Sequence, residues 1–215
     1  ISWMGAAAGN LACICNVLRI AISYNSFDVL EDGYGINLRP LSMFAASAYR
    51  DDPCTRFKPH ILDQNIYDVV DPGLVAKMHK AIAICQFKVE GQRIKRHPEY
   101  GLNHRCLLEH VDFDKGTVEV DGKTYPMLDM KFPTIDPKDP LKLTEQEAEL
   151  LQTLKMSFRH SGLLHKHIKF LYSHGSMYKC CNNNLLYHGC IPLKKDGSFD
   201  DIVFYGIPYS GKALM

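Results

Sequence analysis

Apolar residues recur at helical spacing in the region of residues 72–99. They lie three and four positions apart, which is the period of an amphipathic helix. These residues are Val75, Met78, Ile82, Cys85 and Val89. The pair Asp71-Pro72 precedes them and supplies an N-cap followed by a first-turn proline. The pattern predicts that residues 63–99 are largely helical, with an interruption at Asp71-Pro72-Gly73 where the second helix begins.

Two further helical patterns lie on either side of this segment. Residues 41–49 predict a short helix that Asp51-Asp52-Pro53 ends. Thr144 and Glu147 form a capping box that opens another helix, with apolar positions at Leu150, Leu151, Leu154 and Phe158. Ser161-Gly162 breaks that helix, and a following one carries Leu164, Ile168 and Leu171.

Alternating patterns predict short strands in two places. Around residues 107–127, short alternating runs are separated by the turn sequences Asp114-Lys115-Gly116 and Asp121-Gly122, which is typical of a small antiparallel meander. Residues 184–189 form an apolar run that predicts a buried strand ending in a tight turn.

The N-terminal residues 2–24 fit one helix. Residues 1–18 carry no charge, and Gly5 and Gly9 form a GxxxG pattern that also occurs in membrane helices. Asn10, Asn16 and Arg19 argue against a membrane span, and there is no charged region for a signal peptide. We therefore expect a buried helix whose small residues pack closely against a sheet.

Composition and charge exclude several classes of protein. The chain has 25 Lys and Arg against 24 Asp and Glu, a formal net charge of +1, which argues against nucleic-acid and membrane-surface binding. A hydrophobic content of 46% is enough for a sizeable core and predicts a globular protein. The eight cysteines are too few and too irregularly spaced for a disulfide framework, so we expect reduced thiols and a cytoplasmic location.

One stretch of the chain has no acidic residue. The 46 residues between Glu149 and Asp196, here called the acid-free stretch, contain seven Lys or Arg and five His. One interpretation is a site for a multiply charged anion such as a phosphorylated small molecule. The other is a solvated helix face balanced by acids elsewhere in the fold, and the sequence favours neither.

A cluster of histidines and cysteines lies in the same stretch, within 17 residues: His174, Cys180, Cys181, His188 and Cys190. Such residues can bind zinc, but the spacing lacks a paired C-x₂-C, and adjacent cysteines project differently. A zinc site is therefore a weak hypothesis, and catalysis by a cysteine nucleophile is a weaker one. His188 also stands beside Gly189 where an apolar strand ends, as metal-binding histidines do in metallophosphatases, although a core histidine is the default interpretation.

Three runs of sequence carry a family resemblance. Residues 170–193, FLYSHGSMYKCCNNNLLYHGCIPL, closely resemble the class 3 fructose-1,6-bisphosphatases, a bacterial branch of the calcineurin-like metallophosphoesterases. Residues 3–21, WMGAAAGNLACICNVLRIA, and residues 34–41, YGINLRPL, resemble the same family. The resemblance spans essentially the whole chain. It differs at Cys190, which replaces the second glycine of the family's His-Gly-Gly segment.

The resemblance implies a fold and a division of the chain. The fold class is α+β: a mainly helical segment with a small antiparallel meander and a C-terminal strand that belongs to a metallophosphoesterase αββα sandwich. Residues 1–24 would be a helix of the phosphatase core, 25–165 a family-specific cap, and 166–215 a return to the core. The family's other metal-binding segments, such as Gly-Asp-x-x-Asp-Arg and Gly-Asn-His-Asp, are absent, so the chain reads as an internal segment of a longer enzyme.

The resemblance also implies an activity. The full enzyme would hydrolyse fructose 1,6-bisphosphate to fructose 6-phosphate and phosphate, a gluconeogenic step, at a dinuclear Mn²⁺ or Mg²⁺ centre with His188 as one ligand. The acid-free stretch offers cations for the second phosphate: Arg159, Lys166, Lys169 and Lys179. The expected partners are the sugar bisphosphate and the rest of the same polypeptide, with no nucleic acid and no membrane, and the oligomeric state stays open.

Two alternatives remain at this point. The chain could be a non-catalytic module that binds zinc or a polyanion, or part of a related phosphatase with another substrate. In every case a segment with one carried-over metal ligand is expected to be inactive alone, because one histidine cannot hold two metal ions.

Overall fold

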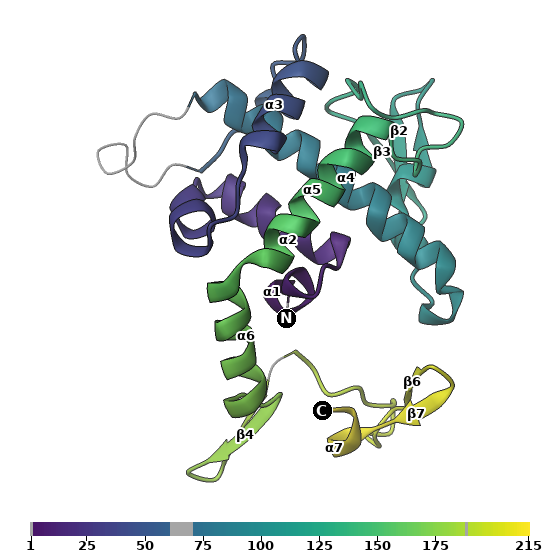
Figure 1. The fold of residues 1–215 in the computed structure, drawn as a ribbon. Helices are drawn as coiled ribbons and strands as arrows, with labels where there is room; N and C mark the ends of the chain where they lie inside the picture. Colours follow the sequence, from purple (N-terminus) through teal and green to yellow (C-terminus); the bar gives the residue numbers. More distant parts are fainter. Residues whose placement is uncertain (1, 61–70, 188) are drawn as a thin grey trace. The chain divides into compact units, whose positions relative to one another are not determined.

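The computed structural model describes residues 2–60, 71–187 and 189–215. The chain separates into two compact units, unit 1 with residues 1–166 and unit 2 with residues 167–215. About half of the described residues are helical, and the strands form small antiparallel pairs, which confirms the α+β class. Figure 1 shows the elements along the chain.

The elements of unit 1 are α1 (Ser2–Ala7), α2 (Leu11–Ser23), the π-helical turn η1 (Val29–Gly33), α3 (Arg39–Ala48), η2 (Thr55–Phe57), α4 (Pro72–Arg96), η3 (Pro98–Tyr100), η4 (Asn103–Arg105), η5 (Leu107–His110), β1 (Val111–Asp112), β2 (Thr117–Val120), β3 (Lys123–Pro126) and α5 (Glu145–His160). Helix α6 (Gly162–His174) begins in unit 1 and ends in unit 2. Unit 2 continues with β4 (Tyr178–Cys181), β5 (Asn184–Tyr187), β6 (Ile202–Phe204), β7 (Ile207–Tyr209) and α7 (Gly211–Leu214).

The N-terminal segment forms two helices, so the prediction of one helix over residues 2–24 is wrong. Gly9 adopts a left-handed conformation with φ of 84°, and the Asn10 side chain caps α2 by accepting a hydrogen bond from the Cys13 N–H at 3.2 Å. The predicted close packing does occur, but α1 packs on α2 and α5 and not on a sheet. A Cβ on Gly5 would clash with the Cys13 sulfur, which is why a small residue is needed.

The question of a membrane span is settled for the described part of the chain. No helix among residues 2–60, 71–187 and 189–215 is long and apolar enough to cross a bilayer.

Helix α4 is the longest helix of the described chain, and α2 and α3 pack on it (Figure 1). Asp71 caps it by accepting a hydrogen bond from the Gly73 N–H at 2.8 Å, and Pro72 is its first residue, as predicted. All five residues of the predicted apolar stripe are buried. Helix α3 confirms the short helix predicted near residues 41–49, whereas the helical prediction for residues 63–70 lies outside the described residues.

The predicted meander is present as the sheet β1-β2-β3. Val118 pairs with Val111 on one side and with Tyr125 on the other, both antiparallel. The two-residue turn between β2 and β3 uses Asp121 and Gly122, both with positive φ, as expected for an Asp-Gly hairpin turn.

Helix α5 begins with the predicted capping box. The Thr144 hydroxyl accepts from the Glu147 N–H at 3.1 Å, and the Glu147 carboxylate accepts from the Thr144 N–H at 2.8 Å. The four predicted apolar residues of the helix are buried, and Ser161 is its C-cap.

Unit 2 consists of two hairpins, β4–β5 and β6–β7, together with α7. The strand predicted in residues 184–189 forms as β5, but the prediction that it is buried is wrong. Its side chains are exposed, with Leu185 at 50% and Leu186 at 56%, because a two-stranded hairpin has no second layer to cover its faces. The β6–β7 hairpin was not predicted; its turn is Tyr205-Gly206, which is not one of the common hairpin pairs.

Candidate functional site

The hairpin β4–β5 leads directly to the predicted metal ligand. Tyr178 pairs with Tyr187 and Cys181 with Asn184, and the turn residues Asn182 and Asn183 both have positive φ. His188 follows Tyr187, the last residue of β5, and lies outside the described residues. Its role as a metal ligand therefore stays a prediction.

The other members of the histidine and cysteine cluster do not assemble into a metal site. Among the residues that the structure describes, no three His, Cys, Asp or Glu side chains lie close enough to hold a metal ion. His174 stacks on Phe170 with ring centroids 4.4 Å apart, and its Nδ1 lies 2.8 Å from the Ser173 hydroxyl. Cys180, Cys181 and Cys190 are exposed free thiols. The described residues thus do not fit a zinc centre or a two-metal centre by themselves.

The end of α5 holds two cations beside the N-terminal segment. Arg159 lies in the last turn of α5, and Lys155 is one turn earlier on the same side. A Cβ on Gly9 would lie 3.1 Å from both Cδ of Arg159 and Cε of Lys155, so both aliphatic stems cover the glycine. The sequence analysis did not select Lys155 as a site residue, although its four-residue spacing from Arg159 was a usable signal.

Two of the runs that carry the family resemblance meet at this end of α5. Trp3 contacts Tyr34 with ring centroids 5.3 Å apart and Phe158 with centroids 6.4 Å apart. The Ser161 hydroxyl donates to the Tyr34 carbonyl at 2.6 Å, and the Asn37 N–H donates to the Ser157 hydroxyl at 3.2 Å. Residues 3–21 and 34–41 therefore fix the start of the acid-free stretch.

The remaining predicted substrate-binding cations are exposed. Lys166 and Lys169 lie three residues apart on α6, and Lys179 lies on β4 opposite Leu186. Within the described chain, none of the four candidate side chains, the three lysines and Arg159, forms an ion pair. Arg159 and Lys166 belong to unit 1, and Lys169 and Lys179 belong to unit 2. Their grouping in one substrate site therefore stays a prediction.

Two lysines of α4 are fully buried, which the sequence analysis missed because it treated only apolar residues as core. The Lys80 ammonium lies 2.6 Å from Asp52 Oδ2 and 2.7 Å from Asp129 Oδ2, above the rings of Phe57 and Phe132. Burial alone would raise the pKa of Asp52, but the hydrogen bonds from Lys80 and from the Cys54 N–H outweigh it and lower the pKa. This network ties the loop after β3 to α4.

The second buried lysine joins α4 to α5. The Lys88 ammonium donates to Glu147 Oε2 at 2.7 Å and to the Thr134 carbonyl at 2.6 Å, and both charged side chains are fully buried. The other Glu147 oxygen, Oε1, is buried without a hydrogen-bond partner. Because Glu147 also belongs to the capping box with Thr144, one carboxylate fixes the start of α5 and its attachment to α4. Both lysine side chains are fully buried and held by carboxylates, so neither ammonium group is open to a substrate.

With this geometry described, comparison with known proteins identifies the family. A family model described as Firmicute fructose-1,6-bisphosphatase matches residues 1–215. The chain belongs to this family. It is 52% identical over 215 residues to the class 3 fructose-1,6-bisphosphatase of Clostridium novyi, 53% identical to that of Clostridium tetani, and 50% identical to that of Listeria monocytogenes.

Each of these three alignments covers all of this chain but only 32% or 33% of the relative, so the chain spans about a third of their length. No solved structure matches the chain. The family resemblance found in the sequence is confirmed. The family match includes the end of α5 and the β4–β5 hairpin.

Proposed function

We propose that the chain is part of a fructose-1,6-bisphosphatase that hydrolyses fructose 1,6-bisphosphate to fructose 6-phosphate and phosphate. The observation that carries the proposal is the family match over all 215 residues, together with relatives of that name that are about half identical. A gluconeogenic role in the cytoplasm follows from this substrate, and the reduced state of the described cysteines is compatible with it.

We further propose a dinuclear Mn²⁺ or Mg²⁺ centre in the whole enzyme, with His188 as one ligand. Bound metal ions of this kind clamp a phosphate and activate water. The described residues contain no set of three donors for such an ion, so the proposal requires the remaining ligands to come from outside them.

Arg159 is the best supported of the four proposed substrate-binding cations. Its stem is held over Gly9 next to Lys155, while no described carboxylate neutralises its guanidinium. A guanidinium matches the oxygens of a phosphate with two parallel hydrogen bonds. Lys166, Lys169 and Lys179 support the proposal more weakly, because exposed lysines are common on any protein surface.

The proposed partner of unit 2 is the rest of the same polypeptide. Large apolar side chains of unit 2 are exposed, including Tyr172 at 71%, Phe199 at 56% and Tyr205 at 88%. Exposed apolar groups at this density are typical of a surface that packs on something else. The chain covers about a third of the length of its relatives, so we propose that the rest of the polypeptide packs on these exposed apolar side chains of unit 2.

The division into core and cap also remains a proposal: residues 1–24 and 166–215 in the phosphatase core, and 25–165 in the cap. The structure adds that α2 packs on α4 within unit 1, so the first of these segments and the proposed cap share one packed unit. We expect the cap to shape substrate choice.

The test is phosphate release from fructose 1,6-bisphosphate in the presence of Mn²⁺, measured for the full-length protein that contains this chain and for the 215-residue chain alone. We expect activity only in the full-length protein and its loss in His188→Ala. The matched control is His174→Ala, an exposed histidine of the same stretch whose described contacts are all with Phe170 and Ser173 of its own helix. Full activity of His188→Ala would refute the proposed role of His188 as a metal ligand. If the full-length protein hydrolyses a different phosphate ester and not fructose 1,6-bisphosphate, the proposed substrate is wrong.

A further inference from the structure

Two segments of the chain that lack acidic residues meet in unit 1. None of the 27 residues before Asp28 is Asp or Glu, and the acid-free stretch begins after Glu149. Helices α1 and α2 belong to the first of these segments, and both pack on α5, whose residues from Leu150 onward belong to the second. At this junction, neither segment can supply a carboxylate to the cations of the other.

The cations at the junction are Lys155 and Arg159, and their side chains converge on Gly9. A Cβ on Gly9 would lie 3.1 Å from Cε of Lys155 and 3.1 Å from Cδ of Arg159, so the two carbons are at most twice that distance apart. Each of them is bonded directly to a nitrogen of the charged group. Two charge-assisted N–H···O bonds of about 2.8 Å, one on either side of a phosphate, span a comparable distance. One phosphate group can therefore bridge the two side chains.

Neither cation has a partner in the part of the chain that the structure describes. Neither side chain makes a hydrogen bond or an ion pair there. The Gly9 turn leads into the N-terminal end of α2, where a helix carries partial positive charge and offers no compensation. The last turn of α5 favours a cation, which accounts for Arg159 but not for Lys155 one turn earlier. Because like charges four residues apart on a helix repel, the pair calls for an anion from outside the described residues.

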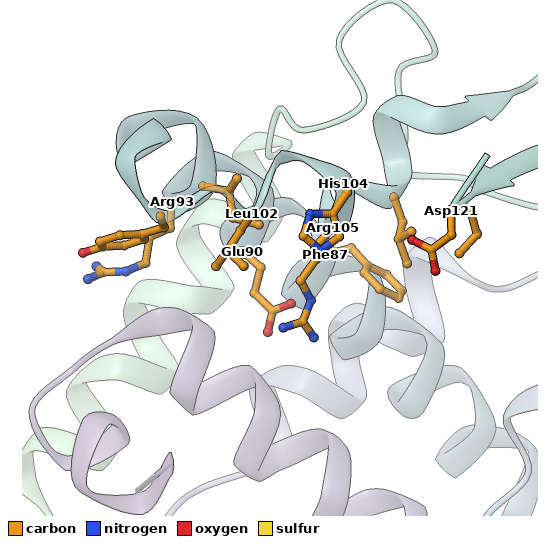
Figure 2. Close-up of a pocket in the computed structure, with 11 residues that line it drawn as sticks. Phe87, Glu90, Arg93, Leu102, His104, Arg105 and Asp121 are labelled. Carbon is orange, nitrogen blue, oxygen red and sulfur yellow. The ribbon is translucent and has the colours of Figure 1, made fainter. Parts of the chain in front are cut away.

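Another group of cations in unit 1 differs in this respect. A cavity of about 630 Å³ beside α4 has Arg93 and Arg105 in its lining, together with Glu90 and Asp121 (Figure 2). Figure 2 shows Glu90 between the two arginines. Two acids thus stand against two arginines, and this lining does not select an anion. An unbalanced pair of cations is a property of the α5 junction and not of every basic group in unit 1.

We propose that Lys155 and Arg159 together bind one phosphate group, and that in the enzyme this is the substrate phosphate that is not hydrolysed. A phosphate has three terminal oxygens, so it can accept from the Arg159 guanidinium and from the Lys155 ammonium at the same time. Gly9 has a part in this arrangement, because a side chain at that position would displace both stems. The assignment to the substrate rests on the proposed function, whereas the phosphate site itself does not.

The phosphate site is tested by direct binding. The probe is fructose 6-phosphate, because the proposed product keeps the phosphate that is not hydrolysed. Equilibrium dialysis on the full-length protein that contains this chain, with metal ions removed by a chelator, measures binding without catalysis. We expect saturable binding of fructose 6-phosphate and none of fructose. No saturable binding at millimolar fructose 6-phosphate, or equal binding of fructose, would overturn the proposal.

Substitutions locate the phosphate. Lys155→Met and Arg159→Met remove the charge but keep an unbranched stem over Gly9, and each should weaken binding by at least about tenfold, as expected for a lost charge-assisted hydrogen bond. Lys155→Arg keeps the charge and should retain most of the affinity. The matched control is Lys142→Met, an exposed lysine just before α5 that forms no ion pair in the described chain. Circular dichroism checks that each variant keeps its helices, and parental affinity in a folded Lys155→Met or Arg159→Met variant would refute the site.

Kinetics decide whether this phosphate belongs to the substrate. With Mn²⁺ present, Lys155→Met should lower kcat/KM for fructose 1,6-bisphosphate by at least about tenfold, the same factor as for binding. Its kcat/KM for p-nitrophenyl phosphate, which has no second phosphate, should not change. If Lys155→Met loses binding of fructose 6-phosphate but keeps its kcat/KM for fructose 1,6-bisphosphate, the assignment to the substrate is wrong. If the parent protein does not hydrolyse fructose 1,6-bisphosphate at all, the proposed function fails, and the dialysis result still decides the phosphate site.

Discussion

The buried ion pair between Lys88 and Glu147 allows a sharp test of how unit 1 is held together. The substitution Glu147→Gln removes one charge but keeps the size of the side chain, and glutamine still serves in a capping box with Thr144. The change therefore isolates the electrostatic contribution. It leaves the ammonium of Lys88 fully buried without a counter-charge, and its remaining acceptors, the Thr134 carbonyl and the glutamine amide oxygen, are neutral.

The expected loss of stability follows from this burial. Removing one partner of a buried ion pair destabilises a protein by about 3–5 kcal/mol, because the other charge is left without compensation. Combining Glu147→Gln with Lys88→Met removes both charges, and the remaining cost is the Thr134 carbonyl without a donor, about 1–3 kcal/mol. The double variant should therefore be more stable than Glu147→Gln alone, a non-additivity that a double-mutant cycle measures directly.

Urea unfolding followed by Trp3 fluorescence is the assay, because this is the only tryptophan of the chain and it packs on Tyr34 and Phe158 within unit 1. The control is Glu109→Gln, which breaks the Lys95–Glu109 pair; this pair has the same 2.7 Å separation, but its side chains are 51% and 34% exposed. We expect no measurable change for the control. Additive single and double variants, or a Glu147→Gln variant as stable as the parent chain, would refute the reasoning.

Two further predictions concern Asp52 and Gly9. The pKa of Asp52 is lowered in the folded chain, so its contribution to stability is present above the usual value of 3.8 and is lost as the pH falls below it. In urea unfolding experiments at decreasing pH, Asp52→Asn should lose less stability than the parent chain. The same loss of stability with pH in both proteins would contradict this. Gly9→Ala should destabilise the chain by about 1–2 kcal/mol for the left-handed backbone, and by more where the new methyl group displaces the stem of Arg159. Gly122→Ala, at φ of 73° with open space around it, is the matched control, and equal losses in the two variants would show that the contact contributes nothing.

The elements that the sequence predicted correctly are those specified by local chemistry. The apolar stripe of α4, the Asp71 cap and the Thr144–Glu147 box each depend on residues within a few positions of one another. The break between α1 and α2 was missed because alanine and apolar residues surround Gly9, so helical periodicity outweighs one glycine and one asparagine. The tertiary contact with α5, which places two cationic stems over Gly9, adds a reason for a glycine there that no local pattern reveals.

The buried charges could not be predicted for a different reason. Lys80 and Lys88 are polar residues on a helix, and the ordinary expectation for a lysine is a solvated surface position. Their carboxylate partners lie 28, 49 and 59 residues away in sequence, so no local pattern links them. The cavity of about 630 Å³ lined by Phe87, Arg105 and Val120 is similar, because its walls come from α4, η4 and the end of β2.

The near-neutral charge of the whole chain conceals an uneven distribution that bears on function. Among the described residues, the ion pairs of Lys and Arg lie between Asp52 and Glu147, and those of Lys80 and Lys88 anchor buried lysines of the fold. The cations from Lys155 to Lys195 have no such partners in the part of the chain that the structure describes. The Lys and Arg side chains of the acid-free stretch are therefore not used to hold the described fold together, which is what the proposed binding of a phosphorylated ligand requires of them.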